Sequence, residues 1–481
     1  MATALALALP HPTEAATGQG APSGSAAGFG LFLPPYLAQQ RVAAIHASPH
    51  PANKVVVSNC DDTGPGSLRA SVVSAAEGDT VDMSSLTCST ITLYSGAITI
   101  NQNNLTLTGS GANTLAITGA YAYHAYELDR IINHVGTGIL TVADLSVSYG
   151  APYSMTSAVH GGCIASAGSV YLKNAVVTRC TAKTNGLSLL SDGGGVYAAG
   201  YISLVGSIVE NSRTLAVGSA SYAFGGGVFA GTGLLCNRCS IESNLASATG
   251  SAIGGGAYAR TAKLEYSTIS GNQASIGGGI VVRGANFELF DSTVSGNRAT
   301  QKVGGVYSAT NTMVYYSTIA FNTVISGTSQ PNLAPGLTVR TNGPAFTVTL
   351  NNALISNNTY GTSTENDFSV DASGGGSVTV TGGGNLIRTT FSSVPNDTIT
   401  GACPDLGPLR DNDGPTKTHA LLSHSPAIDR GHVGTFHPAY DQRGPGPPIP
   451  HLRVSGPAPD ICAYEVQQND IVFNNGFDGC P

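Results

Sequence analysis

The sequence predicts an all-β fold, namely a right-handed parallel β-helix of about ten coils with a short N-terminal capping helix and an irregular C-terminal region. A unit of about 25 residues recurs through the middle of the chain, as in solenoids. Its segments are short and rich in β-branched residues, and Gly, at 62 of 481 residues, interrupts any helical period. Such repeats are typical of a stacked coil rather than of a sandwich.

The first half of each repeat is a β-branched residue followed three places later by Asn. Like residues of successive parallel coils lie about 4.8 Å apart, so the aliphatic residues are expected to form an internal column. Each Asn is expected at a corner, where its amide bonds backbone groups and the neighbouring asparagines. The pairs are Ile208/Asn211, Ile241/Asn244, Ile269/Asn272, Val294/Asn297, Ile319/Asn322 and Ile355/Asn358, preceded by Val177/Cys180.

The second half of each repeat is a glycine knot that leads into a strand. These knots occupy residues 161–164, 193–196, 225–228, 254–257, 277–280 and 304–306. Gly is expected at this corner because it alone takes positive φ without steric cost. The repeat varies in length mainly between the Asn and the glycines, where 184–190 and 214–222 are predicted to bulge outward.

Composition divides the chain into four parts. Residues 1–54 are rich in Ala, Pro, Gly and Ser and are expected to be a leader and flexible segment, with 1–16 similar to the back half of a secretory signal. The coil is predicted over 55–400, closed by a helix after the N-cap Ser67 with Leu68, Val72 and Ala75 on one face. Residues 401–465 form an irregular region, and 466–481 a C-terminal tail.

Charge and hydropathy exclude several partners. The net charge of −7 leaves no basic surface for nucleic acid. No stretch approaches the roughly 18 to 20 apolar residues that a membrane span requires. No metal ligand set or cofactor motif is identified.

Nine cysteines favour an oxidising compartment, and their odd number leaves at least one thiol unpaired. Cys60 with Cys88 and Cys163 with Cys180 are possible disulfides. The C-x-x-C at 236–239 lacks both the second pair of a zinc site and the α/β surroundings of a redox motif, so neither is predicted.

Several motifs together resemble a known group. Residues 64–69 (Gly-Pro-Gly-Ser-Leu-Arg) resemble the N-terminal caps of exported bacterial right-handed β-helix proteins, and the repeats are similar to those of polymorphic outer-membrane proteins. Motifs at 413–418, 425–429, 441–444 and 460–465 resemble the choice-of-anchor domain (Q type) that follows such helices. The resemblance implies a secreted or cell-surface protein, extracellular or held at a Gram-negative outer membrane. It brings no catalytic residues.

A polysaccharide-degrading enzyme, either a lyase or a glycoside hydrolase, is the alternative function. Glycoside hydrolysis needs two carboxylates about 5 to 9.5 Å apart. Counted from the aliphatic residue of each coil, Glu210 and Glu242 fall at neighbouring offsets, which point to opposite faces of a strand. No catalytic residue is therefore assigned, and the case for an enzyme is weak.

The favoured function rests on an aromatic row, in which Tyr197, Phe229, Tyr258 and Tyr307 each stand directly after the inward-facing residue of a glycine knot, with Val281 interrupting. Strand alternation places these rings outside, where they either only stabilise the sheet or also contact sugars or another protein. The sequence thus favours a non-catalytic rod for adhesion, an adhesin-like protein that binds polysaccharide or a neighbouring cell surface through its flanks. Its oligomeric state is left open.

Overall fold

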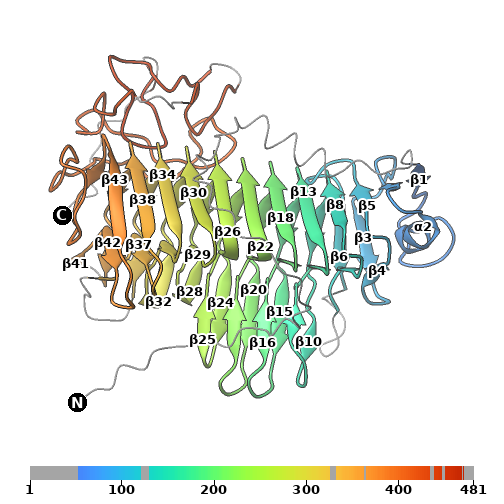
Figure 1. Cartoon of the computed structure of the whole chain (residues 1–481). Coiled ribbons are helices and arrows are strands. Elements are labelled where there is room, and N and C mark those ends of the chain that lie inside the picture. The colour runs from blue at the N-terminus through green and yellow to red at the C-terminus, as the bar shows by residue number, and fades with distance from the viewer. Residues whose placement is uncertain are drawn as a thin grey trace, which may run out of the picture. The chain divides into compact units, whose positions relative to one another are not determined.

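The computed structural model describes residues 53–120, 129–325, 332–361, 364–433, 438–446, 450–467 and 470. They belong to one compact unit, Ser48–Pro481. The chain forms a parallel β-helix, as predicted: strands from successive coils stack side by side along one axis (Figure 1). The predicted leader and most of the predicted C-terminal tail lie outside the described residues. None of the described helices is long and apolar enough to cross a membrane.

Sheet B takes one strand from each coil and has 11 strands. Its strands are β3 (Thr90–Leu93), β6 (Ala116–Gly119), β9 (Ser146–Ser148), β14 (Val176–Thr178), β19 (Ile208–Glu210), β23 (Ser240–Glu242), β27 (Thr268–Ser270), β31 (Thr293–Ser295), β35 (Thr318–Ala320), β39 (Leu354–Ser356) and β44 (Leu386–Ile387).

Sheet A has 20 strands in two rows, joined because β22 (Val228–Asn237) and β26 (Ala257–Glu265) run through both. The first row also holds β4 (Ile98–Ile100), β7 (Ile132–His134), β12 (Ile164–Ser166), β17 (Val196–Ala198), β29 (Ile280–Val282), β33 (Val306–Ser308), β37 (Leu337–Arg340) and β42 (Phe368–Asp371). The second row also holds β1 (Lys54–Val56), β2 (Thr80–Asp82), β5 (Leu105–Thr108), β8 (Ile139–Ala143), β13 (Ser169–Lys173), β18 (Tyr201–Val205), β30 (Asn286–Phe290), β34 (Asn311–Tyr315), β38 (Phe346–Asn351) and β43 (Val378–Gly383).

Sheet C has 13 strands. They are β10 (Tyr153–Ser154), β11 (Val159–His160), β15 (Thr181–Thr184), β16 (Leu190–Asp192), β20 (Arg213–Ala216), β21 (Tyr222–Phe224), β24 (Leu245–Ala248), β25 (Ser251–Ile253), β28 (Gln273–Ile276), β32 (Arg298–Lys302), β36 (Thr323–Val324), β40 (Thr359–Tyr360) and β41 (Thr364–Glu365). Only the pair β40–β41 is antiparallel among the described strand pairs.

The core of the coil is an aliphatic column inside sheet B. Its members all have 0% exposure: Ile91, Ile117, Val147, Val177, Val209, Ile241, Ile269, Val294, Ile319, Ile355 and Ile387. Removing each such side chain from water contributes about 1.5–3 kcal/mol. The assignment of Ile208 to this column is wrong by one residue, because Val209 pairs with Ile241 while Ile208 pairs with Ser240 and is half-buried.

The N-terminal end of the coil is closed by the helix α2 (Leu68–Ser74). The hydroxyl of Ser67 accepts a hydrogen bond from the Ala70 N–H at 3.2 Å, as an N-cap does. The helix packs the predicted apolar face on the coil, with Leu68, Val72 and Ala75 buried. A disulfide between Cys60 and Cys88, the pair named from the sequence, lies at the same end.

The other cysteines are placed as follows. Cys163 and Cys180, also named from the sequence, are bonded across one coil with their Cα atoms 5.4 Å apart. Cys236 and Cys239 form a disulfide that the sequence did not predict. Cys403 is disulfide-bonded, and Cys462 is a buried free thiol. Disulfides of this number are typical of proteins in an oxidising compartment.

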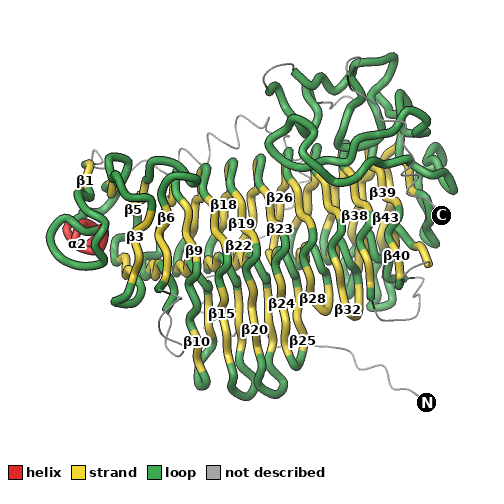
Figure 2. Tube along the Cα trace, turned by 180° about the vertical axis from the view of Figure 1, so that it is seen from behind, coloured by secondary structure: helices red, strands yellow, loops and turns green. Residues whose placement is uncertain are grey.

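The two segments expected to bulge form strands of a projection, here called the wing, made of β10, β11, β15, β16, β20, β21, β24, β25 and β28 of sheet C (Figures 1 and 2). Its two layers are held close by small residues, since its core cluster is Ala216, Ala223, Ala246, Ala252 and Ala274. The wing leaves the coil next to the first row of sheet A, where β16 leads through the glycine knot into β17. This placement brings the wing beside the aromatic row.

The knot glycines take positive φ, with values from 61° to 73° at Gly161, Gly193, Gly225, Gly254 and Gly277. At the sixth knot (304–306) the equivalent corner position is Val303 rather than Gly, with φ of 55°. The expectation of a glycine at this corner is therefore wrong there. Val303 is fully buried, so tertiary packing overrides the steric preference there.

The irregular C-terminal region covers the outer face of sheet B from β23 onward (Figure 2). Side chains on successive strands of the sheet hold it. Glu242 on β23 pairs with Lys417, Thr268 on β27 donates to the Lys417 carbonyl at 2.7 Å, and Thr293 on β31 donates to Gln442 at 2.7 Å. On β35 the Thr318 hydroxyl accepts the Ala463 N–H.

Candidate functional site

The aromatic row is in register on the first row of sheet A. Tyr197 pairs with Phe229, Phe229 with Tyr258, Tyr258 with Val281, and Val281 with Tyr307. The rings of Tyr197 and Phe229 are 5.3 Å apart at 12°, and those of Phe229 and Tyr258 are 5.3 Å apart at 8°. Parallel rings at this distance are offset-stacked, an arrangement that stabilises the sheet. We call Tyr197, Phe229 and Tyr258, all half-buried, the aromatic strip.

Tyr307 does not extend the strip as an accessible ring. Its side chain is only 7% exposed, and burial raises the pKa of its phenol. Val281, between it and Tyr258, is fully buried. The assignment of Tyr307 to a contact surface is therefore wrong, although its register is the expected one.

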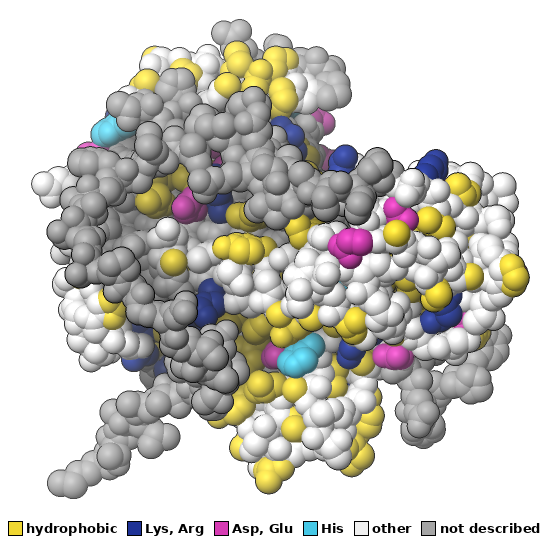
Figure 3. Space-filling model, turned by 45° about the vertical axis from the view of Figure 1, so that its right-hand side comes forward, with side chains coloured by type: hydrophobic (Ala, Val, Ile, Leu, Met, Phe, Trp, Pro, Cys, Tyr) yellow, Lys and Arg dark blue, Asp and Glu magenta, His cyan; other side chains and the backbone are white. Residues whose placement is uncertain are grey.

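The wing adds two rings that the sequence did not indicate. The His160 ring stacks on Tyr197 with centroids 4.5 Å apart, and Phe224 meets Tyr258 edge-on at 5.2 Å. They stand on β11 and β21 of sheet C, and no local sequence pattern indicates that these strands lie against sheet A. Figure 3 shows apolar side chains gathered where the lower projection meets the body of the coil. The strip thus packs at its side against two rings of sheet C.

The tyrosines of the strip are neutral hydrogen-bond donors. Burial, together with the charge of Asp192, raises the pKa of Tyr197. Burial also raises the pKa of Tyr258, although the nearby charges of Arg283 and Arg260 lower it. Phenols with raised pKa values keep their protons across the physiological range, so they can donate hydrogen bonds but do not act as bases.

A buried acid stands at one end of the strip. Asp192 is 4% exposed and lies 3.1 Å from Nδ1 of His160. Burial raises the pKa of Asp192, and the contact with His160 lowers it. The pair fixes the His160 ring against Tyr197, and we assign it a positioning role.

The expectation that Glu210 and Glu242 lie on opposite faces is wrong. The two residues are register partners on β19 and β23, because the coil of Ile208 is shifted by one residue. Glu210 accepts a hydrogen bond from Thr178 at 3.2 Å, and Glu242 is paired with Lys417 of the C-terminal region. The two carboxylates lie on sheet B, apart from the aromatic strip on sheet A.

The asparagine ladder runs through consecutive corners of the coil. In each step the Nδ2 of one Asn donates to the Oδ1 of the next at 2.9–3.0 Å, and the same Oδ1 accepts the backbone N–H of the first. The members are Asn244, Asn272, Asn297, Asn322 and Asn358, and the ladder ends on the buried carboxylate of Asp367. Asn211 is not a member: it is exposed at φ of 51°, and Ser212 takes its place.

A second ladder of serines at another corner was not predicted. The hydroxyls of Ser267, Ser292 and Ser317 accept backbone N–H groups of the preceding coil at 3.0–3.2 Å. The signal for it was present, since each Ser stands two places before the aliphatic residue of its repeat. Both ladders satisfy buried polar groups and are structural.

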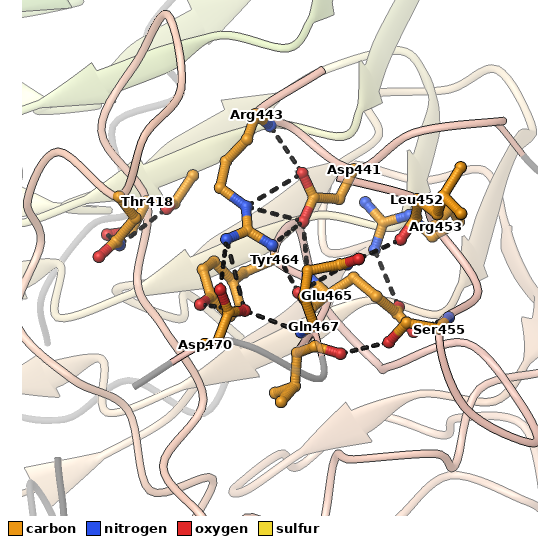
Figure 4. Close-up of polar contacts among 12 residues, drawn as sticks. Thr418, Asp441, Arg443, Leu452, Arg453, Ser455, Tyr464, Glu465, Gln467 and Asp470 are labelled. Carbon is orange, nitrogen blue, oxygen red and sulfur yellow. Dashed lines mark hydrogen bonds and ion pairs between the residues drawn. The ribbon is translucent and has the colours of Figure 1, made fainter. Parts of the chain in front are cut away.

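The C-terminal motifs at 441–444 and 460–465 converge on a buried charge cluster (Figure 4). Arg443 is 2% exposed, and its guanidinium donates to the Asp441 carboxylate at 2.7 Å and to the Glu465 carbonyl at 2.6 Å. The same guanidinium lies 3.9 Å from the Tyr464 ring centroid. Asp441 also accepts the Glu465 N–H at 2.8 Å. The two motifs therefore fold as one unit.

A second arginine joins this cluster to the coil. Arg453 is 1% exposed and pairs with Asp291, which lies at the corner between β30 and β31. Its guanidinium also donates to the Cys462 and Ala463 carbonyls. Burial raises the pKa of Asp291 to about 7, and the charge of Arg453 lowers it. The cluster thus anchors the C-terminal region on the coil through a contact that spans 162 residues.

No group of three or more His, Cys, Asp or Glu side chains that could hold a metal ion occurs within the described ranges. No family model, curated protein or solved structure matches this chain. The surface itself must therefore indicate what the protein binds.

Proposed function

We propose that this protein is a secreted or cell-surface β-helix that binds glycans, without catalysis, through the aromatic strip. The observation that carries the proposal is the strip: consecutive half-buried rings, offset-stacked at 5.3 Å, with phenol hydroxyls at two of three positions. Aromatic rings contact the apolar faces of sugars, and their hydroxyls bond the rims.

Rigidity of the strip supports binding. The rings stand on adjacent strands of a continuous parallel sheet, and Phe224 and His160 from the wing hold them from the side. A site ordered before binding loses little conformational entropy when a ligand arrives. The disulfides are consistent with export, where extracellular glycans are met.

The test is glycan-array binding by the full-length protein and by the double variant Tyr197→Ser, Tyr258→Ser. We expect array binding by the wild type and a loss of at least about tenfold in the variant, equal to about 1.4 kcal/mol. Tyr94→Ser is the control, since Tyr94 is 67% exposed and lies outside the strip. Unchanged binding in the double variant, with an unchanged unfolding midpoint, refutes the proposal.

A second candidate, a polysaccharide-degrading enzyme, gains support from the register of Glu210 and Glu242. The two residues are neighbours on adjacent parallel strands, about 4.8 Å apart along the coil axis. The pairing of Glu242 with Lys417 weakens this candidate because it occupies one carboxylate. Turnover of neutral or acidic polysaccharides that is abolished by Glu210→Gln establishes this candidate, and the absence of turnover across such a panel eliminates it.

A further inference from the structure

We propose that the ligand of the aromatic strip is an acidic glycan, whose carboxylate groups bind Arg260 and Arg283, the first two members of an arginine column that ends at Arg340. The proposal rests on the proposed glycan-binding function and adds the chemical class of the ligand. The column lies beside the strip on the same face of sheet A.

The register of sheet A builds this column. Ala259 pairs with Val282, Val282 with Ser308, and Ser308 with Val339. The residue that follows each of these in the chain is Arg260, Arg283, Ala309 and Arg340. Successive positions are therefore stacked at about 4.8 Å per coil, with a single gap at Ala309.

The column and the strip share a face. Tyr258 and Arg260 are two residues apart in β26, so strand alternation points both side chains outward. The same spacing relates Val281 to Arg283. The charges of Arg283 and Arg260 both lower the pKa of the Tyr258 phenol.

The first two arginines have no carboxylate partner among the described residues. Among the described residues no acid lies within ion-pair distance of Arg260, which is exposed, or of Arg283, which is half-buried. Arg340 is paired with Asp371 at 3.3 Å. Like charges on adjacent strands destabilise a sheet, and a bound anion relieves that repulsion.

Charge complementarity selects an acidic glycan. Guanidinium groups bind carboxylates in a bidentate manner, and aromatic rings contact the sugar rings that bear them. The column offers a few charges spaced by whole coils, which matches charges carried on separate sugar units. Nucleic acid has a charge about every 1.7 Å of duplex, much closer than the spacing of about 4.8 Å per coil in the column.

The test compares polygalacturonate, alginate and hyaluronate with their carboxyl-reduced, neutral counterparts, using the full-length protein. We expect at least one acidic polymer to bind at least about tenfold more tightly than its neutral counterpart, and the preference to weaken as salt rises. Arg260→Gln with Arg283→Gln removes the charges and is expected to abolish the preference. Arg179→Gln, an exposed arginine at a different corner, is the control and is expected to keep it.

The outcomes separate the two proposals. Equal binding of the acidic and reduced forms overturns the acidic-glycan proposal and leaves glycan binding intact. If the protein binds none of these polymers but binds neutral glycans on the array, the acidic-glycan proposal fails and glycan binding stands. If single-stranded DNA binds as tightly as the best uronate, the column is a general polyanion site, and the proposal fails. If no glycan of any kind binds, both proposals fail.

Discussion

The asparagine ladder offers the sharpest test of how this coil is held together. Asn297 has 0% exposure and makes four side-chain hydrogen bonds. Its Nδ2 donates to the Ile269 carbonyl at 3.0 Å and to Asn322 at 2.9 Å, and its Oδ1 accepts two bonds from Asn272 at 3.0 and 2.9 Å. Replacement by Ala deletes all four bonds.

The magnitude follows from the groups left without partners. In Asn297→Ala the backbone N–H of Asn272 and one proton of its Nδ2 remain buried with no acceptor, at about 1–3 kcal/mol each. We therefore expect the free energy of unfolding to fall by about 2–6 kcal/mol. Asn297→Ser is expected to cost less, because Ser212 shows that a hydroxyl at this position still accepts the N–H of the preceding coil.

The control is Asn211→Gly. Asn211 matches the same sequence pattern but lies outside the ladder at positive φ, which Gly adopts freely. We expect a change within about 0.5 kcal/mol. Urea unfolding measures the global effect, and amide hydrogen exchange of Asn272 measures the local one, with protection lost in Asn297→Ala. If the Ala variant costs no more than the Asn211 control, the ladder does not stabilise the coil.

The other predictions concern a corner, a buried carboxyl and the C-terminal anchor. Gly225→Ala is expected to lower the free energy of unfolding by about 2–5 kcal/mol, because the added Cβ would lie 2.1 Å from the Val228 carbonyl oxygen and φ is 61°. Gly296→Ala is the control: its Cβ would meet nothing within 4 Å, so it should cost only about 1–2 kcal/mol. Equal effects of the two variants in urea unfolding contradict this expectation. Burial raises the pKa of Asp367 to about 7, above its unfolded value near 4, so its contribution to stability is complete at low pH and is lost as pH rises through 7. The free energy of unfolding of Asp367→Asn should therefore rise relative to that of the wild type as pH increases from 5 to 8. A difference between the two proteins that does not change with pH rules this out. Arg453→Met leaves buried carboxylates unpaired, so we expect the free energy of unfolding to fall by about 3–5 kcal/mol and protease to cleave the C-terminal region. Cleavage should be faster at pH 8 than at pH 5, because burial raises the pKa of Glu465 to about 8 and its carboxyl is charged only at the higher pH. Protease resistance equal to the wild type contradicts the anchoring role.

The sequence predicted the coil because its repeat is local. A β-branched residue, a polar corner and a glycine knot recur at short spacing, and stacking then follows from the parallel register. One coil was misaligned because Ile208 and Val209 both head a matching pattern, ending at Asn211 and Ser212. The serine two places before the aliphatic residue, Ser207 in this coil, distinguishes the two frames.

Features that join distant parts of the chain were not predicted. The wing rings His160 and Phe224 reach the strip only because sheet C folds back on sheet A. Arg453 and Asp291 are separated by 162 residues, and no local pattern relates them. The arginine column escaped notice for a simpler reason: its members follow the strand residues that define the repeat, and only the register shows that they are stacked.

The way in which the C-terminal region holds sheet B limits how this protein can change length. Its contacts begin at Glu242 and continue over successive coils to Asn352, each with a particular strand or corner. Duplicating a coil within that stretch would shift the later contacts by one strand spacing, about 4.8 Å, and break them. A coil added before β23 would disturb none of them. The C-terminal region therefore restricts the number of coils that it contacts, whereas the number of coils before β23 can change without breaking these contacts.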